Sequence, residues 1–165
     1  RSRGLGDVYK RQISKISGNW RVQFEKNAFV DYYECLPERI RPDSLTTERI
    51  KIIAALTAKG GLLNECDYLW LDAFKSRIAD NLIESLLKYA TLLDEHEAFD
   101  TKLLISDIIF RFDSVNEAAL RLKCATYVFM RKQYMAKTTY EHFCREYKSL
   151  YDEPFEHSFN SIISQ

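Results

Sequence analysis

The chain has 165 residues, of which 46% are hydrophobic and 13% aromatic, and its 24 basic and 24 acidic side chains give a formal net charge of zero. This length suits one domain, and the apolar fraction excludes disorder over the whole chain. No apolar run is long enough for a transmembrane helix, and only 5 glycines and 3 prolines favour long helices over a turn-rich β fold.

The first 12 residues stand apart in charge, with four basic side chains and one acidic one. They contain no apolar stretch of the kind that a signal peptide needs. The segment resembles the translated read-through of a sequencing adapter, and the alternative is a flexible basic tail. We leave residues 1–12 out of the fold prediction and expect the native chain to extend upstream of Ile13.

The following stretch alternates apolar and polar residues after Gly18. Trp20, Val22 and Phe24 fall on one side of an extended chain, which predicts a short, half-buried strand over 18–24.

Helical signals begin at Asp31, which can cap a short helix that ends near Pro37. After a loop, Thr46 caps a second helix. This helix closes at Gly60 and Gly61, because glycine takes the left-handed conformation without penalty.

From Tyr68 onward, apolar residues recur with the helical period in a stripe wide enough for a helix that packs on more than one side. Trp70 is expected to pack beneath it in the core. Polar residues at 94–97 end the pattern, and a further helix covers 98–112. The stripe consists of Leu71, Phe74, Ile78, Leu82, Leu86 and Tyr89.

The spacing of Ser114 and Glu117 matches a capping box and predicts the start of the next helix. A break at 131–133 separates it from another helix, which Pro154 stops, and residues 155–163 form a last short helix. The sequence thus predicts an all-α fold, a stack of antiparallel helical hairpins with one short strand near the N-terminus.

No residue pattern indicates catalysis, since the chain has neither a phosphate-binding glycine loop nor a nucleophile elbow. His142 and Cys144 would point about 160° apart on a helix, and His96 stands in a solvated turn without a second histidine to share a metal. We expect a cytoplasmic protein that is not an enzyme and has no catalytic, metal or cofactor site. Thiols without CxxC spacing are expected to stay reduced and buried, namely Cys35, Cys66, Cys124 and Cys144.

The hairpin 115–147 resembles a tetratricopeptide repeat, a helix–turn–helix unit of about 34 residues. The two positions at which the helices of that repeat approach closely fall on Cys124 and Ala136, and its aromatic packing positions fall on Tyr127 and Tyr140. The pair 79–112 fits the repeat only loosely. The hairpin departs from the repeat at Leu120, Phe143 and Ser149, where the repeat prefers tryptophan, alanine and a nearby proline.

Three stretches carry a longer resemblance: LLNECDYLWLDAFK at 62–75, FDSVNEAALRLK at 112–123 and AKTTYEHFCREY at 136–147. They resemble the bacterial transcriptional activator domain, the helical module that follows the winged helix in regulators of the antibiotic-regulatory-protein type. The family's last wing strand and the start of its helical domain are matched by Gly18, Trp20, Val22, Phe24 and Asp31.

This resemblance implies that 13–29 is the end of a winged-helix DNA-binding domain and that 30–165 is the helical activator domain. The implied function is a protein-interaction module of a transcription regulator. Its partners would be its own DNA-binding domain, the transcription machinery or a sensor domain, with DNA bound only by the missing upstream domain. The alternative is a tetratricopeptide-like scaffold with no link to DNA.

By analogy with the repeat family, the first helix of the hairpin would line a partner groove, with Arg121 as its one charged group. Glu117, Glu141 and Glu146 lie among the cations of 115–150, so we interpret the rest of this basic region as a solvated helical face. The predicted partner-binding residues are Ala118, Arg121, Ala125 and Val128.

Overall fold

The computed structural model describes residues 11–24, 39–60, 68–94 and 98–164. The chain divides into two compact units, 1–31 and 32–165, and each has its own internal contacts. The predicted short helix after Asp31 lies outside the described residues, as do His96, Cys35 and Cys66.

The first unit contains an antiparallel hairpin of two strands, β1 (Arg11–Ile16) and β2 (Asn19–Phe24). Ile13 pairs with Val22 in its register. Both turn residues have positive φ, 51° at Ser17 and 86° at Gly18, as the tightest hairpin turns require.

The alternating pattern predicted β2 but not its partner. β1 begins at Arg11, so it takes in the last two residues of the segment that the sequence analysis set aside. The expectation of a single strand is therefore corrected to a hairpin, in which the two backbones hydrogen-bond to each other along their facing edges.

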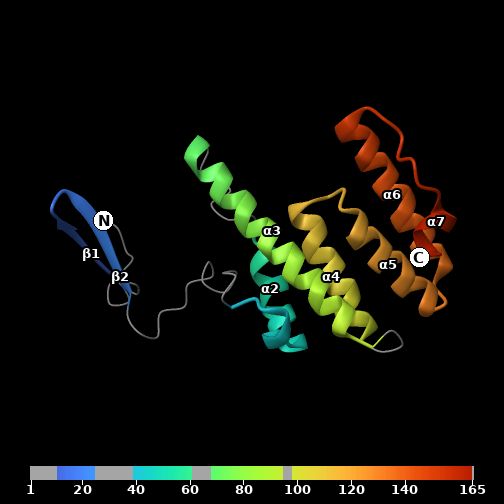
Figure 1. Ribbon diagram of the computed structural model, residues 1–165, viewed down its shortest axis with the longest axis horizontal. Helices are drawn as coiled ribbons and strands as arrows, with labels where there is room; N and C mark the ends of the chain where they lie inside the picture. Colours follow the sequence, from blue (N-terminus) through green and yellow to red (C-terminus); the bar gives the residue numbers. More distant parts are fainter. Residues whose placement is uncertain (1–10, 25–38, 61–67, 95–97, 165) are drawn as a thin grey trace, which may run out of the picture. The chain divides into compact units, whose positions relative to one another are not determined.

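The second unit is mostly helical, as predicted (Figure 1). A 3₁₀ turn, η1 (Pro42–Ser44), precedes the α-helices. The helices are α2 (Thr47–Thr57), α3 (Leu69–Leu92), α4 (Phe99–Phe112), α5 (Glu117–Phe129), α6 (Gln133–Tyr151) and α7 (Phe159–Ile163).

Side-chain caps fix the starts of several helices. The Thr46 hydroxyl accepts the N–H of Arg49 at 3.2 Å, which confirms the cap predicted for α2. The capping box predicted at Ser114 is wrong, because Asn116 caps α5 by accepting the N–H of Ala119 at 3.0 Å. Ser114 lies instead in a turn.

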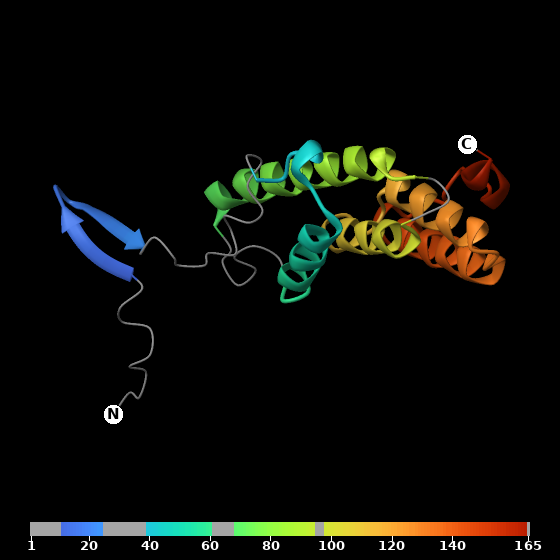
Figure 2. The ribbon, with the colours of Figure 1, turned by 90° about the horizontal axis from the view of Figure 1, so that it is seen from below.

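From α3 to α6 each helix packs against the next, and contacts join α3 to α4, α4 to α5 and α5 to α6 (Figures 1 and 2). α2 also packs on α4, and α7 on α5. Of Trp70, the structure describes only the backbone, in the first turn of α3. Within the described residues, no helix combines the length and the apolar character that crossing a membrane requires.

Two clusters of buried side chains hold these helices together. The first, which we call the aliphatic core, joins α2, α3 and α4 through residues such as Ile50, Ile53, Leu82, Leu86, Ile105, Ile108 and Ile109. The second, which we call the aromatic core, joins α5, α6 and α7 through Leu120, Cys124, Ala136, Phe143 and Ile162 and through the rings packed against them.

Candidate functional site

The close approach of α5 and α6 shapes the surfaces at the C-terminal end of the chain. Cys124 and Ala136 are both fully buried, and the Cys124 thiol lies 3.5 Å from the carbonyl oxygen of Ala136. Small residues on both helices permit this close approach of α5 and α6, which larger side chains would prevent. Burial raises the pKa of the Cys124 thiol to about 12.

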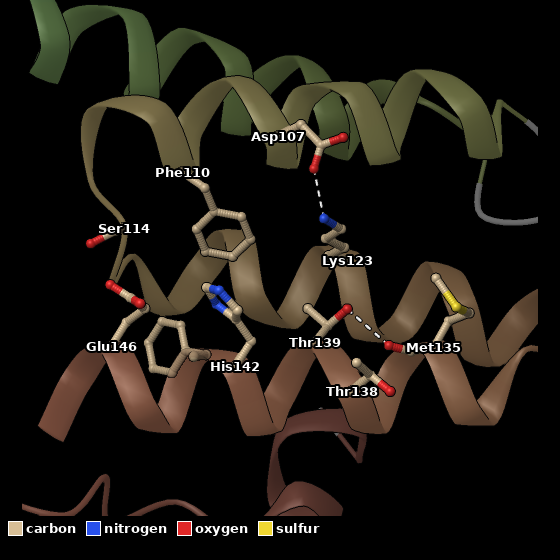
Figure 3. Close-up of a pocket in the computed structure, with 10 residues that line it drawn as sticks. Asp107, Phe110, Ser114, Lys123, Met135, Thr138, Thr139, His142 and Glu146 are labelled. Atoms are coloured by element: carbon tan, nitrogen blue, oxygen red, sulfur yellow. Dashed lines mark hydrogen bonds and ion pairs between the residues drawn. The ribbon is translucent and has the colours of Figure 1, made fainter. Parts of the chain in front are cut away.

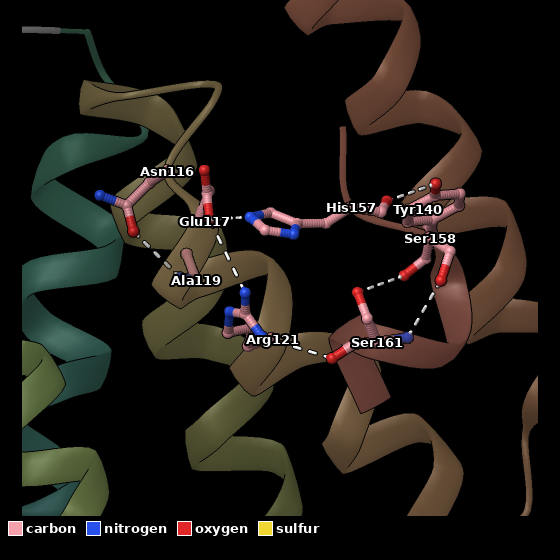
Figure 4. Close-up of polar contacts among 8 residues, drawn as sticks. All are labelled: Asn116, Glu117, Ala119, Arg121, Tyr140, His157, Ser158 and Ser161. Carbon is pink, nitrogen blue, oxygen red and sulfur yellow. Dashed lines mark hydrogen bonds and ion pairs between the residues drawn. The ribbon is translucent and has the colours of Figure 1, made fainter. Parts of the chain in front are cut away.

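The four predicted partner-binding residues lie at intervals of three and four along α5, so they share one face. Arg121 is half-buried on this face, and its guanidinium lies 3.8 Å from a carboxylate oxygen of Glu117. The same guanidinium donates to the carbonyl oxygen of Ser161 at 3.4 Å (Figure 4). Ala118 is exposed, whereas Ala125 and Val128 are half-buried.

The chain's own C-terminal segment, residues 155–163, therefore covers the part of this face around Arg121. Ile162 of α7 is only 2% exposed and belongs to the aromatic core. The Tyr140 hydroxyl donates to the carbonyl oxygen of His157 at 2.8 Å, which holds the segment to α6 (Figure 4). The sequence predicted a last helix over 155–163, but the helix begins only at Phe159, and the surface on which it packs was not predicted.

Aromatic rings complete the docking of this segment. The ring of Phe155 meets Phe143 edge-on with centroids 4.8 Å apart, and Phe159 meets Tyr140 edge-on at 5.6 Å. Burial, and next the neighbouring Cys144 thiol, raise the pKa of Tyr140 to about 12. The hydroxyl thus keeps the proton that it donates to the carbonyl oxygen of His157 to a higher pH than an ordinary tyrosine would.

A second surface feature is a hollow of about 520 Å³ between α4, α5 and α6 (Figure 3). Lys123 of α5 donates to Asp107 of α4 at 2.6 Å, and its ammonium lies 5.7 Å from the centroid of the Phe110 ring. The remaining lining residues are Ser114, Met135, Thr138, Thr139, His142, Phe143 and Glu146.

None of the predicted partner-binding residues lines this hollow. Its α6 side presents residues at positions 135, 138, 139, 142 and 146, which share one helical face. This spacing was visible in the sequence, but the mixed polarity of these residues resembles an ordinary solvated face. The ion pair of Asp107 with Lys123 joins two helices and leaves no local signal in the sequence.

The hollow suits binding better than it suits acid–base chemistry. Asp107 and Lys123 neutralise each other, while Phe110, Met135 and Phe143 supply apolar walls. Within the described part of the chain, no cluster of three or more histidine, cysteine, aspartate or glutamate residues could hold a metal ion.

The chain was compared with protein-family models, with curated proteins and with solved structures, and none of the three comparisons finds a match.

Proposed function

We propose that the helical unit is the protein-interaction module of a bacterial transcription regulator of the antibiotic-regulatory-protein type. The observation that carries this proposal is the close approach of α5 and α6 at Cys124 and Ala136, the two positions at which the resemblance to a tetratricopeptide repeat requires small residues. Tyr127 and Tyr140 pack against the same core, in agreement with their proposed role as aromatic packing positions.

The capacity to bind another segment is supported by α7. The α5 face that the resemblance assigns to a partner holds a helix with a buried isoleucine, Ile162, and takes a main-chain oxygen of that helix as the acceptor for Arg121. A surface that binds one short amphipathic helix has the apolar contacts and the donor that a partner helix needs.

The hairpin of β1 and β2 favours the regulator over a scaffold with no link to DNA. An antiparallel hairpin is what the wing of an upstream winged helix would contribute at this point of the chain. A stand-alone stack of helical hairpins has no need of it.

Two experiments test the proposal, and the first is to sequence the source gene upstream of the codon for Ile13. A reading frame that continues into a winged helix is the expected result. A frame that starts with the arginine-rich first residues would overturn the regulator and favour the scaffold.

The second experiment uses the full-length product in a reporter assay on its own upstream region. Arg121→Ala should reduce activation several-fold while the circular dichroism spectrum and DNA binding stay as in the parent. Arg145→Ala, at an exposed position of α6, is the matched control and should activate normally. Equal activation by both variants would exclude the Arg121 face as the partner surface.

A further inference from the structure

The turn between α5 and α6 carries an unusual concentration of positive charge. Residues 118–140 contain five cations and no aspartate or glutamate. Two of the cations are used inside the fold, because Arg121 faces Glu117 and Lys123 binds Asp107. The other three are Arg131, Lys132 and Lys137, all exposed, and no described residue forms a hydrogen bond or an ion pair with their side chains.

The backbone conformation at Arg131 is strained for a residue with a side chain. Its φ is 57°, in the left-handed region, and its N–H bonds to the carbonyl oxygen of Val128 while that of Lys132 bonds to Tyr127. This is the helix-ending motif in which glycine is preferred, since a side chain is strained there. Asp152, at the end of α6, has the same φ of 57° and provides a comparison.

Exposed apolar side chains flank Arg131 and Lys132 in the sequence. Tyr134 is 80% exposed, Phe129 49% and Met135 42%. Met135 also lines the hollow between α4, α5 and α6 (Figure 3). The charged turn and the hollow therefore adjoin at this residue. We call residues 129–135 together with this hollow the tip surface.

We propose that the tip surface binds an acidic segment of a partner protein, one in which carboxylates alternate with aromatic or aliphatic side chains. Arg131 and Lys132 would pair with the carboxylates, and Phe129, Tyr134 and Met135 would contact the side chains between them. Lys137 does not contribute, because it lies two residues from Met135 on α6 and points about 160° away from it. Methionine suits such a surface because its flexible thioether adapts to different apolar partners.

The same observations disfavour two other polyanions. A nucleic acid is recognised through many basic groups and a strong positive field, whereas the tip surface has two cations without an ion pair, Arg131 and Lys132, and the chain has a formal net charge of zero. Stable membrane binding needs a larger apolar face than three side chains give. The proposal does not rest on a role in transcription, since a scaffold with no link to DNA would carry the same surface.

Binding to the full chain tests the proposal. The probe is a short fluorescein-labelled peptide in which Asp and Glu alternate with Phe and Leu, measured by fluorescence anisotropy. The double variant Arg131→Glu, Lys132→Glu should weaken binding about tenfold or more, because two charge-assisted contacts become repulsive. The control reverses two exposed cations elsewhere on α6, Arg145→Glu and Lys148→Glu, and should bind like the parent.

Nucleic acid and membranes are tested as alternative ligands. A random-sequence DNA duplex and phosphatidylserine vesicles should both bind more weakly than the peptide. Failure of the peptide to bind, equal loss in the control variant, or tighter binding of the duplex or the vesicles would each overturn the proposal.

A second pair of variants separates binding from folding. Arg131→Gly and Asp152→Gly should both raise the melting temperature, because glycine relieves the left-handed backbone at each site. Only Arg131→Gly should weaken peptide binding. Unchanged binding by a stabilised Arg131→Gly protein would show that the peptide does not use the tip surface.

Discussion

The aliphatic and aromatic cores are built in different ways. The aliphatic core consists mainly of isoleucine and leucine from three helices, and seven of its members on these helices are completely buried. The aromatic core contains two small residues, Cys124 and Ala136, where α5 and α6 meet. The aromatic rings packed around its buried members are only half-buried. This core also depends on α7, which has only five residues.

This difference indicates where stability and adaptability lie. Isolated helices as short as α7 do not persist in water, so α7 exists because Ile162 and its neighbouring rings dock on α5 and α6. We therefore expect the aliphatic core to set the global stability of the unit and the aromatic core to open locally at lower free energy.

The largest effect should come from truncation in the aliphatic core. Leu86→Ala removes a completely buried side chain and should lower the free energy of unfolding by about 3 kcal/mol, since it leaves a cavity among closely packed helices. Urea denaturation at equilibrium measures this. Leu92→Ala, at a mostly exposed position of the same helix, should change it by less than about 0.5 kcal/mol. Similar losses in both variants would contradict the assignment of stability to this core.

A smaller and more local effect is expected at α7. Ile162→Ala should weaken the docking of α7 by about 2 kcal/mol and speed amide exchange there, while exchange in α3 and α4 stays unchanged. Hydrogen exchange followed by mass spectrometry resolves the segments. Equal acceleration in all three helices would mean that the two cores unfold as one.

Alkaline pH should weaken the same docking through Tyr140. Its pKa of about 12 in the folded protein lies above the ordinary value of 10.0, so the folded state holds the proton more tightly than the unfolded chain does. The resulting stabilisation is complete below pH 10 and is lost as the pH rises toward 12. Comparing the pH dependence of unfolding in Tyr140→Phe and in the parent isolates this effect, and identical slopes would contradict it.

The smallest expected effect is a difference in cysteine reactivity, which tests whether α5 and α6 stay in contact. Because the thiolate is the reactive form, a fully buried Cys124 with a pKa near 12 should resist alkylation by iodoacetamide at neutral pH. Cys144, which the sequence predicted to be buried, is instead half-buried and should react before Cys124, as peptide mapping of the labelled protein would reveal. Faster labelling of Cys124 than of Cys144 would show that α5 and α6 separate in solution.

The helices could be predicted from the sequence because their signals are local. The break at 131–133 and the stop before Pro154 both appear in the structure, where α5 ends at Phe129 and α6 spans Gln133–Tyr151. The start of α5 was misplaced because Asp113, Ser114 and Asn116 are all good capping residues, and only the folded turn selects among them. In that turn Asp113 accepts the N–H of Val115 and a side-chain N–H of Asn116.

The surfaces were harder to predict than the helices. The intervals along α5 correctly placed Arg121 and its neighbours on one face, but nothing local indicated that residues 155–163 would cover that face. The hollow depends on an ion pair between Asp107 and Lys123, which are 16 residues apart on different helices. Contacts of this kind arise from packing, and a pattern within one helix does not encode them.

The way in which α7 is held has a consequence for how its sequence can change over evolution. Arg121 and Tyr140 both bind main-chain oxygens of the C-terminal segment, those of Ser161 and His157, and every residue type offers such an oxygen. These two contacts would survive most substitutions at positions 157 and 161, whereas the buried Ile162 tolerates few. The segment is therefore free to diversify around one fixed apolar anchor, and an unrelated chain with a similar anchor could take its place.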